Sequence, residues 1–182
     1  MSSLVALAVS IGVLGGVATI LYLKVGLLIW AGFIAWACFF HSGGTTTALT
    51  NTIFCNVFGA FCAWVAAIVI LSFPLADTLT LPVWAGIVVG ITVMLMVLGA
   101  KIPAFSTIPA SVYGYAAIFA YLLQTPEALT KEKLLSMGLA NGFFLVVISL
   151  IVGALFGFAS AKVAGALTAK APAGGMAAKA TA

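Results

Sequence analysis

The chain has 182 residues, of which 65% are hydrophobic and only 5% are charged, and its mean hydropathy is +1.34. A soluble domain carries about 25% charged residues, so this composition excludes a water-facing surface over most of the molecule and indicates lipid as the surrounding solvent. The net charge of +4 comes from seven lysines against three acids. Because the lysines form no basic patch interleaved with aromatic residues, we expect no nucleic-acid partner.

Apolar runs follow one another along almost the whole chain. A membrane-spanning helix needs about 20 mostly apolar residues. The sequence predicts six such runs, at residues 4–23, 25–40, 50–72, 83–100, 108–123 and 134–161. We therefore expect an all-α, polytopic transmembrane protein with one six-span domain over residues 1–162, its halves being about 1–77 and 78–162. Residues 163–182 are rich in Ala, Gly, Lys and Thr and predict a mobile tail.

The two halves can be aligned as an internal repeat. With a shift of 77 residues, Trp36 falls on Tyr113, and Asn56 falls on Asn141 when the charged loop of the second half is treated as an insertion. Three spans in each half, an odd number, would insert the halves in opposite directions. Inverted repeats of this kind occur in transporters, with the substrate path near the midplane. The sequence thus predicts six helices as two inverted three-helix repeats, with chance similarity between apolar stretches as the alternative.

The distribution of lysine predicts the orientation in the membrane. Three of the lysines lie near the C-terminal end, at Lys162, Lys170 and Lys179. Because cytoplasmic segments carry an excess of lysine, we expect a cytoplasmic C terminus, and six spans place the N terminus on the same side. Lys24 then falls on the outer side, where its side chain can snorkel to the interface.

The sequence holds no catalytic or metal-binding constellation. Cys38, Cys55 and Cys62 lie in apolar runs, no two of them form a Cys-X-X-Cys pair, and the single histidine is His41. Buried thiols that behave as small hydrophobes explain these cysteines, and a metal site would need more nitrogen or acidic ligands. The three carboxylates lie in predicted loops, and general acid–base chemistry needs titratable groups. We therefore expect no cofactor, no metal and no enzymatic activity.

Two irregular stretches and two amides are the candidates for a solute path. These residues are His41, Ser42, Gly43, Gly44, Thr45, Asn56, Ser106, Thr107, Pro109, Ser111 and Asn141. Irregular backbone within a bilayer is tolerated only where protein or water satisfies it. Each stretch is therefore either an ordinary turn outside the bilayer or a broken segment that lines a path. The amides either hold helices together or line a polar route. The histidine is interfacial, belongs to a pH-sensitive pore, or binds a metal.

Aromatic and glycine residues suggest a constriction and an oligomer. Trp30, Trp36, Phe39 and Tyr113 are the candidates for an aromatic constriction. Interfacial belts and ordinary packing are the alternative explanation of these side chains. The glycines of the first, fourth and sixth runs permit close helix contact, so we expect a homo-oligomer in the lipid bilayer.

The segment Trp30-Ala-Gly-Phe-Ile-Ala-Trp-Ala-Cys-Phe-Phe-His-Ser-Gly-Gly44, with Ile108-Pro-Ala-Ser-Val-Tyr-Gly114, resembles a family of small bacterial inner-membrane proteins. That family is catalogued as domain of unknown function 1097 (DUF1097). The resemblance covers about residues 4–162 and implies six spans and a bacterial inner-membrane location. It implies no substrate, so no functional residue can be taken from it.

The sequence as a whole favours a membrane channel or facilitator. No charge lies clearly within a span, so the solute is expected to be small and neutral or weakly ionised. The alternative is a non-transporting structural or accessory membrane subunit, whose glycine faces would pack against partner proteins. An intramembrane enzyme ranks third, because titratable groups are scarce.

Overall fold

The computed structural model describes residues 1–73 and 75–169, and every regular element in that part of the chain is helical. The α-helices are α1 (Ser3–Val25), α2 (Ile29–His41), α3 (Thr46–Ser72), α4 (Ala76–Leu79), α5 (Leu81–Leu98), α6 (Ile108–Gln124), α7 (Lys131–Leu135) and α8 (Gly142–Ala169). Three 3-10 turns are η1 (Gly99–Lys101), η2 (Pro103–Phe105) and η3 (Pro126–Ala128). The predicted all-α membrane class is confirmed. Of the predicted mobile tail, residues 170–182 lie outside the described residues.

The helices that occupy the six apolar runs differ in length. Four of them are long and apolar enough to cross a membrane: Ser3–Val25, Thr46–Ser72, Leu81–Lys101 and Gly142–Thr168. The other two, α2 and α6, have 13 and 17 residues. At 1.5 Å per residue they rise about 20 and 26 Å, less than the roughly 30 Å of a hydrocarbon core. The molecule therefore combines four full-length helices with two short ones.

Glycines with positive φ set both ends of α2. Gly26 ends α1 in the left-handed conformation (φ 74°), and Gly43 and Gly44 follow α2 with φ of 107° and 67°. Thr45 then starts α3, because its hydroxyl accepts a hydrogen bond from the Ala48 N–H at 3.2 Å. The helix break that the Gly-Gly-Thr pattern predicts is present, and it makes α2 short.

The predicted run over 134–161 is not one helix. The chain leaves α7 after Leu135, turns through Gly138 at a positive φ of 81°, and enters α8 at residue 142. The Asn141 amide oxygen accepts a hydrogen bond from the Phe143 N–H at 2.9 Å, which caps α8. Apolar residues on both sides of the turn hide this break from a hydropathy count. At its other end, α8 continues to Ala169, beyond the predicted limit of the span.

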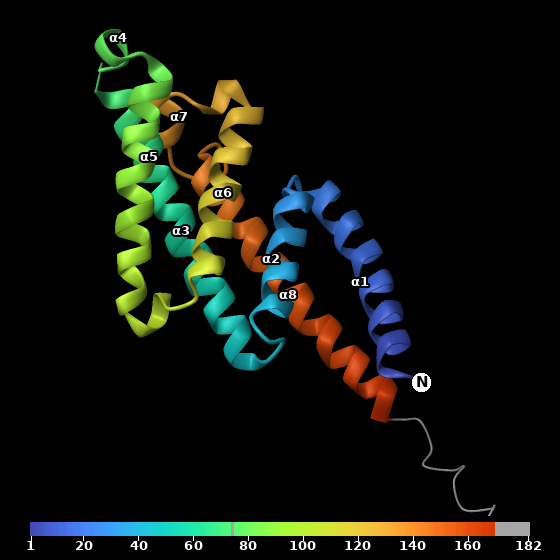
Figure 1. Cartoon of the computed structure of the whole chain (residues 1–182). Helices are drawn as coiled ribbons and strands as arrows, with labels where there is room; N and C mark the ends of the chain where they lie inside the picture. Colours follow the sequence, from blue (N-terminus) through green and yellow to red (C-terminus); the bar gives the residue numbers. More distant parts are fainter. Residues whose placement is uncertain (74, 170–182) are drawn as a thin grey trace, which may run out of the picture.

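The long and short helices pack as two groups of three, visible in Figure 1. In bundle A, α1 and α2 pack along α8, and in bundle B, α5 and α6 pack along α3. The two bundles meet where α3 contacts α8 and where α2 contacts α3 and α6. Much of the shared core is alanine: Ala31, Ala35, Ala60, Ala63, Ala66, Ala67, Ala117 and Ala154. Such small side chains let helices approach closely in lipid.

Candidate functional site

The helices α3 and α6 touch backbone to backbone where they cross. A methyl group added at Gly59 of α3 would overlap the Ser111 carbonyl, and one added at Gly114 of α6 would overlap the Asn56 carbonyl. Only glycine fits at these two positions without moving the helices apart. The crossing is therefore fixed by sequence, and it places Asn56 and Ser111 beside each other's helix.

Three buried polar side chains lie within about one helical turn of this crossing. Thr52, Asn56 and Ser111, here called the polar cluster, are each at most 2% exposed. Both hydroxyls and both amide atoms lack a hydrogen-bond partner among the described residues. Helical threonines elsewhere bond the carbonyl one turn earlier, as Thr19 and Thr92 do. Since an unpaired buried polar group costs about 1–3 kcal/mol, four such atoms at one crossing require an explanation.

Two thiols border the polar cluster from different bundles. Cys38 of α2 and Cys55 of α3 form one buried group with Ala110 of α6. The Cys38 thiol lies beside the Thr52 hydroxyl and 4.0 Å from the Ser42 hydroxyl oxygen. The Cys55 thiol is held at 3.6 Å from the carbonyl of Ala104 in η2. The polar cluster thus lies where α2 of bundle A meets α3 and α6 of bundle B.

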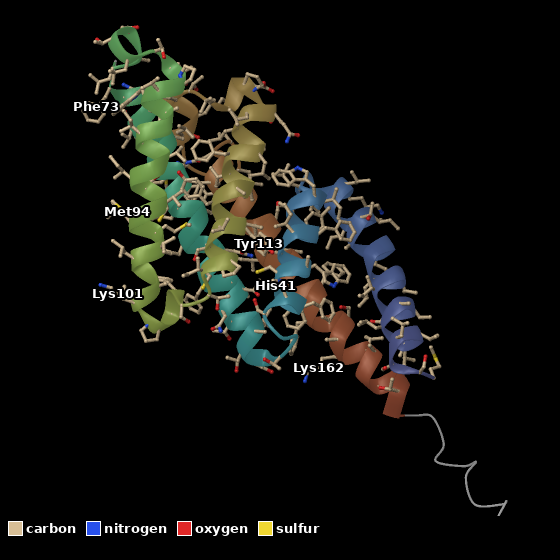
Figure 2. All side chains as sticks on the ribbon, viewed as in Figure 1. His41, Phe73, Met94, Lys101, Tyr113 and Lys162 are labelled. Carbon is tan, nitrogen blue, oxygen red and sulfur yellow. The ribbon has the colours of Figure 1, made fainter. Side chains whose placement is uncertain are left out.

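An aromatic pair joins the bundles next to the polar cluster. The exposed ring of His41, at the end of α2, stands edge-on to Tyr113 of α6, with centroids 6.3 Å apart and an interplanar angle of 86°. Figure 2 shows these two side chains next to each other between the bundles. Tyr113 packs against the buried group of Cys38, Cys55 and Ala110, and Cys38 lies beside Thr52, so the pair borders the polar cluster. The sequence named both residues as candidates but did not place them together.

The two irregular stretches lie at the same end of the molecule in Figure 1. The turn Ser42–Thr45 follows the short helix of the first half, whereas Ser106, Thr107 and Pro109 lie before or at the start of the short helix of the second half. The two stretches therefore do not occupy comparable places in the two halves. All four backbone positions of the first turn are exposed or half-buried, and so are the three residues before α6. Only Ser111 of these candidates reaches the polar cluster.

Asn141 lies away from the polar cluster. Its amide nitrogen donates hydrogen bonds to the carbonyls of Leu134 (2.7 Å) and Ser136 (3.0 Å). The Leu134 carbonyl also accepts a hydrogen bond from the Trp64 indole. Trp64 follows Asn56 by eight residues on α3, which is about 12 Å along the helix axis. Asn56 lies inside α3, whereas Asn141 precedes α8, so the two amides do not occupy equivalent positions. Asn141 holds the α7–α8 turn together.

Three of the four predicted constriction residues pack inside the protein. Trp36 is buried, donates a hydrogen bond from its indole to Ser160 Oγ at 3.1 Å, and stacks on Phe156. Phe39 is fully buried and meets an aromatic ring of α8 edge-on. Trp30 is partly buried against the main core. The side chains of Trp30, Trp36 and Phe39 therefore fill the protein interior. Of the four candidates, only Tyr113 packs against the thiols that border the polar cluster.

Sequence reasoning missed Thr52 and the two crossing glycines. Thr52, Asn56 and Gly59 follow the i, i+4, i+7 spacing, which places them on one face of α3. That spacing was available in the sequence, but the matching partner on α6 was not. Among residues 1–73 and 75–169, no group of three His, Cys, Asp or Glu side chains is placed to hold a metal ion.

Comparison with known proteins identifies the family of the chain. No curated protein and no solved structure matches it. The family model described as "protein of unknown function (DUF1097)" matches residues 8–165, which include most or all of the six apolar helices. This match confirms the resemblance that the aromatic segment ending in Gly-Gly indicates. The chain belongs to the DUF1097 family of proteins of unknown function.

Proposed function

We propose that this protein is a channel or facilitator for a small neutral or weakly ionised solute, and that the solute binds at the polar cluster. One observation carries the proposal: Thr52, Asn56 and Ser111 are buried with four polar atoms that lack partners in the described part of the chain. A structural protein gains nothing from such groups, because apolar side chains of the same shape would be more stable. A passing solute supplies the missing hydrogen bonds.

The depth of the polar cluster supports a route across the membrane. α3 is a full-length span of 27 residues, which rises about 40 Å. Asn56 lies about 15 Å from the start of that helix at the same rise per residue. Asn56 is therefore about 5 Å from the midpoint of α3, and a helix centred on a hydrocarbon core of roughly 30 Å places it at that distance from the midplane. A solute there has lost its water, so hydroxyl and amide groups are what it requires.

The packing of the helices supports two inverted three-helix repeats. The first half contributes α1 and α2 to bundle A, where they pack along α8 of the second half. The second half contributes α5 and α6 to bundle B, where they pack along α3 of the first half. Exchanging the halves therefore converts one bundle into the other, and the short helices α2 and α6 correspond. In transporters built this way the solute site lies where the repeats meet, which is where the polar cluster lies.

The lysines support an orientation in the bacterial inner membrane. Lys101 and Lys162 lie toward the same end of the molecule in Figure 2, the end at which Figure 1 places the N terminus. Lys170 and Lys179 follow Lys162 in the sequence, so four lysines are assigned to this side and three, Lys24, Lys131 and Lys133, to the other. Because lysine is in excess on cytoplasmic segments, we assign this end to the cytoplasm. We place the proposed route past the His41–Tyr113 pair, which joins α2 to α6 beside the polar cluster. Small movements of α2 against α6 would open or close that route.

Glycines on the outer surface support a homo-oligomer. Gly12 and Gly16 of α1, and Gly86 and Gly90 of α5, have open space where a side chain would be. Their four-residue spacing is the small-xxx-small pattern of helix contacts in lipid. Copies of the chain would pack through these faces. We propose no enzymatic activity, since the described helices at the polar cluster carry no carboxylate.

A non-transporting accessory subunit is the second candidate function. An apolar groove of about 440 Å³ opens on the outer surface between α3, η2 and α8. Its lining is almost entirely aromatic: Phe54, Val57, Phe58, Phe61, Phe105 and Phe143. A helix of a partner protein would fit such a groove. This candidate leaves the polar cluster unexplained, and for that reason it ranks second.

Solute flux into proteoliposomes tests the proposed function. Purified protein is reconstituted, and swelling is followed by light scattering for a set of small solutes, with empty liposomes as the reference. At least one solute is expected to enter about tenfold faster than into empty liposomes, and Asn56→Leu is expected to remove the increase. The matched control is Asn51→Leu, the same change on a partly exposed position of α3. The proposal fails if no solute enters faster, or if Asn56→Leu retains the full flux.

A further inference from the structure

We infer that the polar cluster recognises a small uncharged amide, such as a carboxamide or urea. The inference rests on the proposed function and names the solute class of the same site. The Asn56 side chain presents an N–H donor and a C=O acceptor next to each other, and both atoms are unpartnered in the described structure. An amide ligand presents the complementary pair in one plane. Two parallel hydrogen bonds would then satisfy both atoms of Asn56 at once.

Ions do not match the polar cluster. A cation would be bound by the oxygens of Asn56, Thr52 and Ser111 but would face the hydrogens on Asn56 Nδ2. An anion would be bound by those hydrogens and by the hydroxyls but would face Asn56 Oδ1. The ionisable groups nearest to the polar cluster are two thiols, the Tyr113 phenol and the His41 imidazole. The helices α2, α3 and α6 carry no lysine and no carboxylate, so no opposite fixed charge lies on them to repay the dehydration of an ion.

The remaining groups of the polar cluster agree with an amide of few atoms. Thr52 and Ser111 each offer one hydroxyl, which donates or accepts as required. Urea and acetamide have one carbonyl oxygen and at least two N–H groups, enough to engage these hydroxyls together with Asn56. The wall beside Thr52 is apolar or weakly polar, being formed by Cys38 and by the buried Ala110. The contact at Gly59 and Gly114 keeps α3 and α6 close, which limits the occupant to a small molecule.

Solute selectivity tests this inference on the full chain in proteoliposomes. Urea and acetamide are expected to enter about tenfold faster than into empty liposomes, while glycerol, formate and methylammonium stay near the empty-liposome rate. Asn56→Leu and Thr52→Val are expected to remove the amide flux. The controls Asn51→Leu and Thr50→Val, on less buried positions of the same helix, are expected to retain it.

Three outcomes of this screen contradict the inference in distinguishable ways. Glycerol or an ion that enters in an Asn56-dependent manner, while amides do not, overturns the amide class and leaves the proposed function standing. An increase in water permeability alone also overturns it, since water then occupies the polar cluster. If no solute enters faster than into empty liposomes, both the inference and the proposed function fail.

Cys38 provides a binding readout that does not depend on flux. With Cys55→Ala and Cys62→Ala, Cys38 is the single thiol of the protein, beside Thr52. The rate at which methyl methanethiosulfonate, a small uncharged thiol reagent, modifies Cys38 is measured by mass spectrometry. Urea or acetamide is expected to slow this rate at least about twofold, glycerol at the same concentration is not, and Asn56→Leu is expected to abolish the protection. Equal rates with and without amide would overturn the inference.

Discussion

The crossing of α2 with α8 and the crossing of α3 with α6 have the same backbone construction and different chemistry. At the first, a side chain on Gly153 would overlap the Gly32 carbonyl. At the second, Gly59 and Gly114 make the equivalent close approach. Both bundles are therefore held by glycine contacts between a short helix and a long one. The difference lies in the polar side chains that flank each contact.

Buried hydroxyls at the α2–α8 crossing are hydrogen-bonded. The Tyr22 hydroxyl donates to the Ser149 carbonyl at 2.6 Å. Ser149 Oγ accepts from the Leu28 N–H at 3.0 Å and donates to the Leu145 carbonyl at 2.7 Å. Ser160 Oγ accepts from an indole and donates to a backbone carbonyl. The polar groups of the first crossing are thus hydrogen-bonded, whereas four polar atoms at the second lack a partner in the described part of the chain. The proposed solute site rests on this difference.

The substitutions with the largest expected effect on stability disrupt the two crossings equally. Gly153→Ala and Gly59→Ala each place a methyl group against a backbone carbonyl that cannot move without separating the helices. We expect each to lower the free energy of unfolding by about 3 kcal/mol, measured by denaturation in mixed detergent micelles. Gly86→Ala is the matched control, because its added methyl group meets open space. A Gly59→Ala protein as stable as the Gly86→Ala protein would contradict the close approach.

A second pair of substitutions is expected to distinguish the two crossings, because one lowers the free energy of unfolding and the other leaves it unchanged or raises it. Ser149→Ala removes the acceptor of the Leu28 N–H and is expected to destabilise the protein by about 1–2 kcal/mol. Thr52→Val removes a hydroxyl that has no partner in the described part of the chain and is expected to leave stability unchanged or raise it by about 1 kcal/mol. Denaturation of both variants in the same micelles measures the difference. Destabilisation by Thr52→Val would mean that its hydroxyl is satisfied within the folded protein.

The sequence allows the apolar helices to be predicted but not how they pair. The six apolar helices carry hydrophobic residues on the faces that pack on other helices and on their exposed faces alike. Periodicity therefore cannot reveal that α2 packs on α8 and α6 on α3. The same uniformity hides the α7–α8 turn, where Gly138 and Asn141 interrupt an otherwise apolar run. The break at Gly43 and Gly44 was predictable, because two adjacent glycines and a threonine cap signal it locally.

Two of the three residues of the polar cluster could be predicted from the sequence. Asn56 and Ser111 drew attention because an amide in a span and a serine near two prolines are unusual. Thr52 did not, since a threonine in a membrane helix ordinarily bonds its own backbone. Asn141 drew attention for the same reason as Asn56, yet it caps a helix. Residue type alone does not distinguish a satisfied amide from an unsatisfied one, because the answer depends on which helix lies opposite.

A smaller effect is expected for the indole bond of the satisfied crossing. Ser160→Ala leaves the Trp36 indole without the acceptor it has at 3.1 Å, and a loss of about 1 kcal/mol follows. A double-mutant cycle with Trp36→Phe isolates the pair, and a coupling energy of about 0.6 kcal/mol is expected for a hydrogen bond within a membrane protein. Zero coupling would place the cost of Ser160→Ala in lost packing instead.

The smallest effect tests whether bundle B in general leaves its polar groups unpaired. The hydroxyls of Thr92 in α5 and Tyr115 in α6 are hydrogen-bonded at 2.8 Å, and the Thr92 hydroxyl donates to the Val88 carbonyl at 2.9 Å. Tyr115→Phe therefore removes one bond while Thr92 keeps a partner, and we expect a loss of about 0.5 kcal/mol. Solute flux is expected to stay at the wild-type level in the same variant. If Tyr115→Phe instead lowered flux as far as Asn56→Leu does, the solute route would have to extend to the α5–α6 contact, and the polar cluster would be only one part of it.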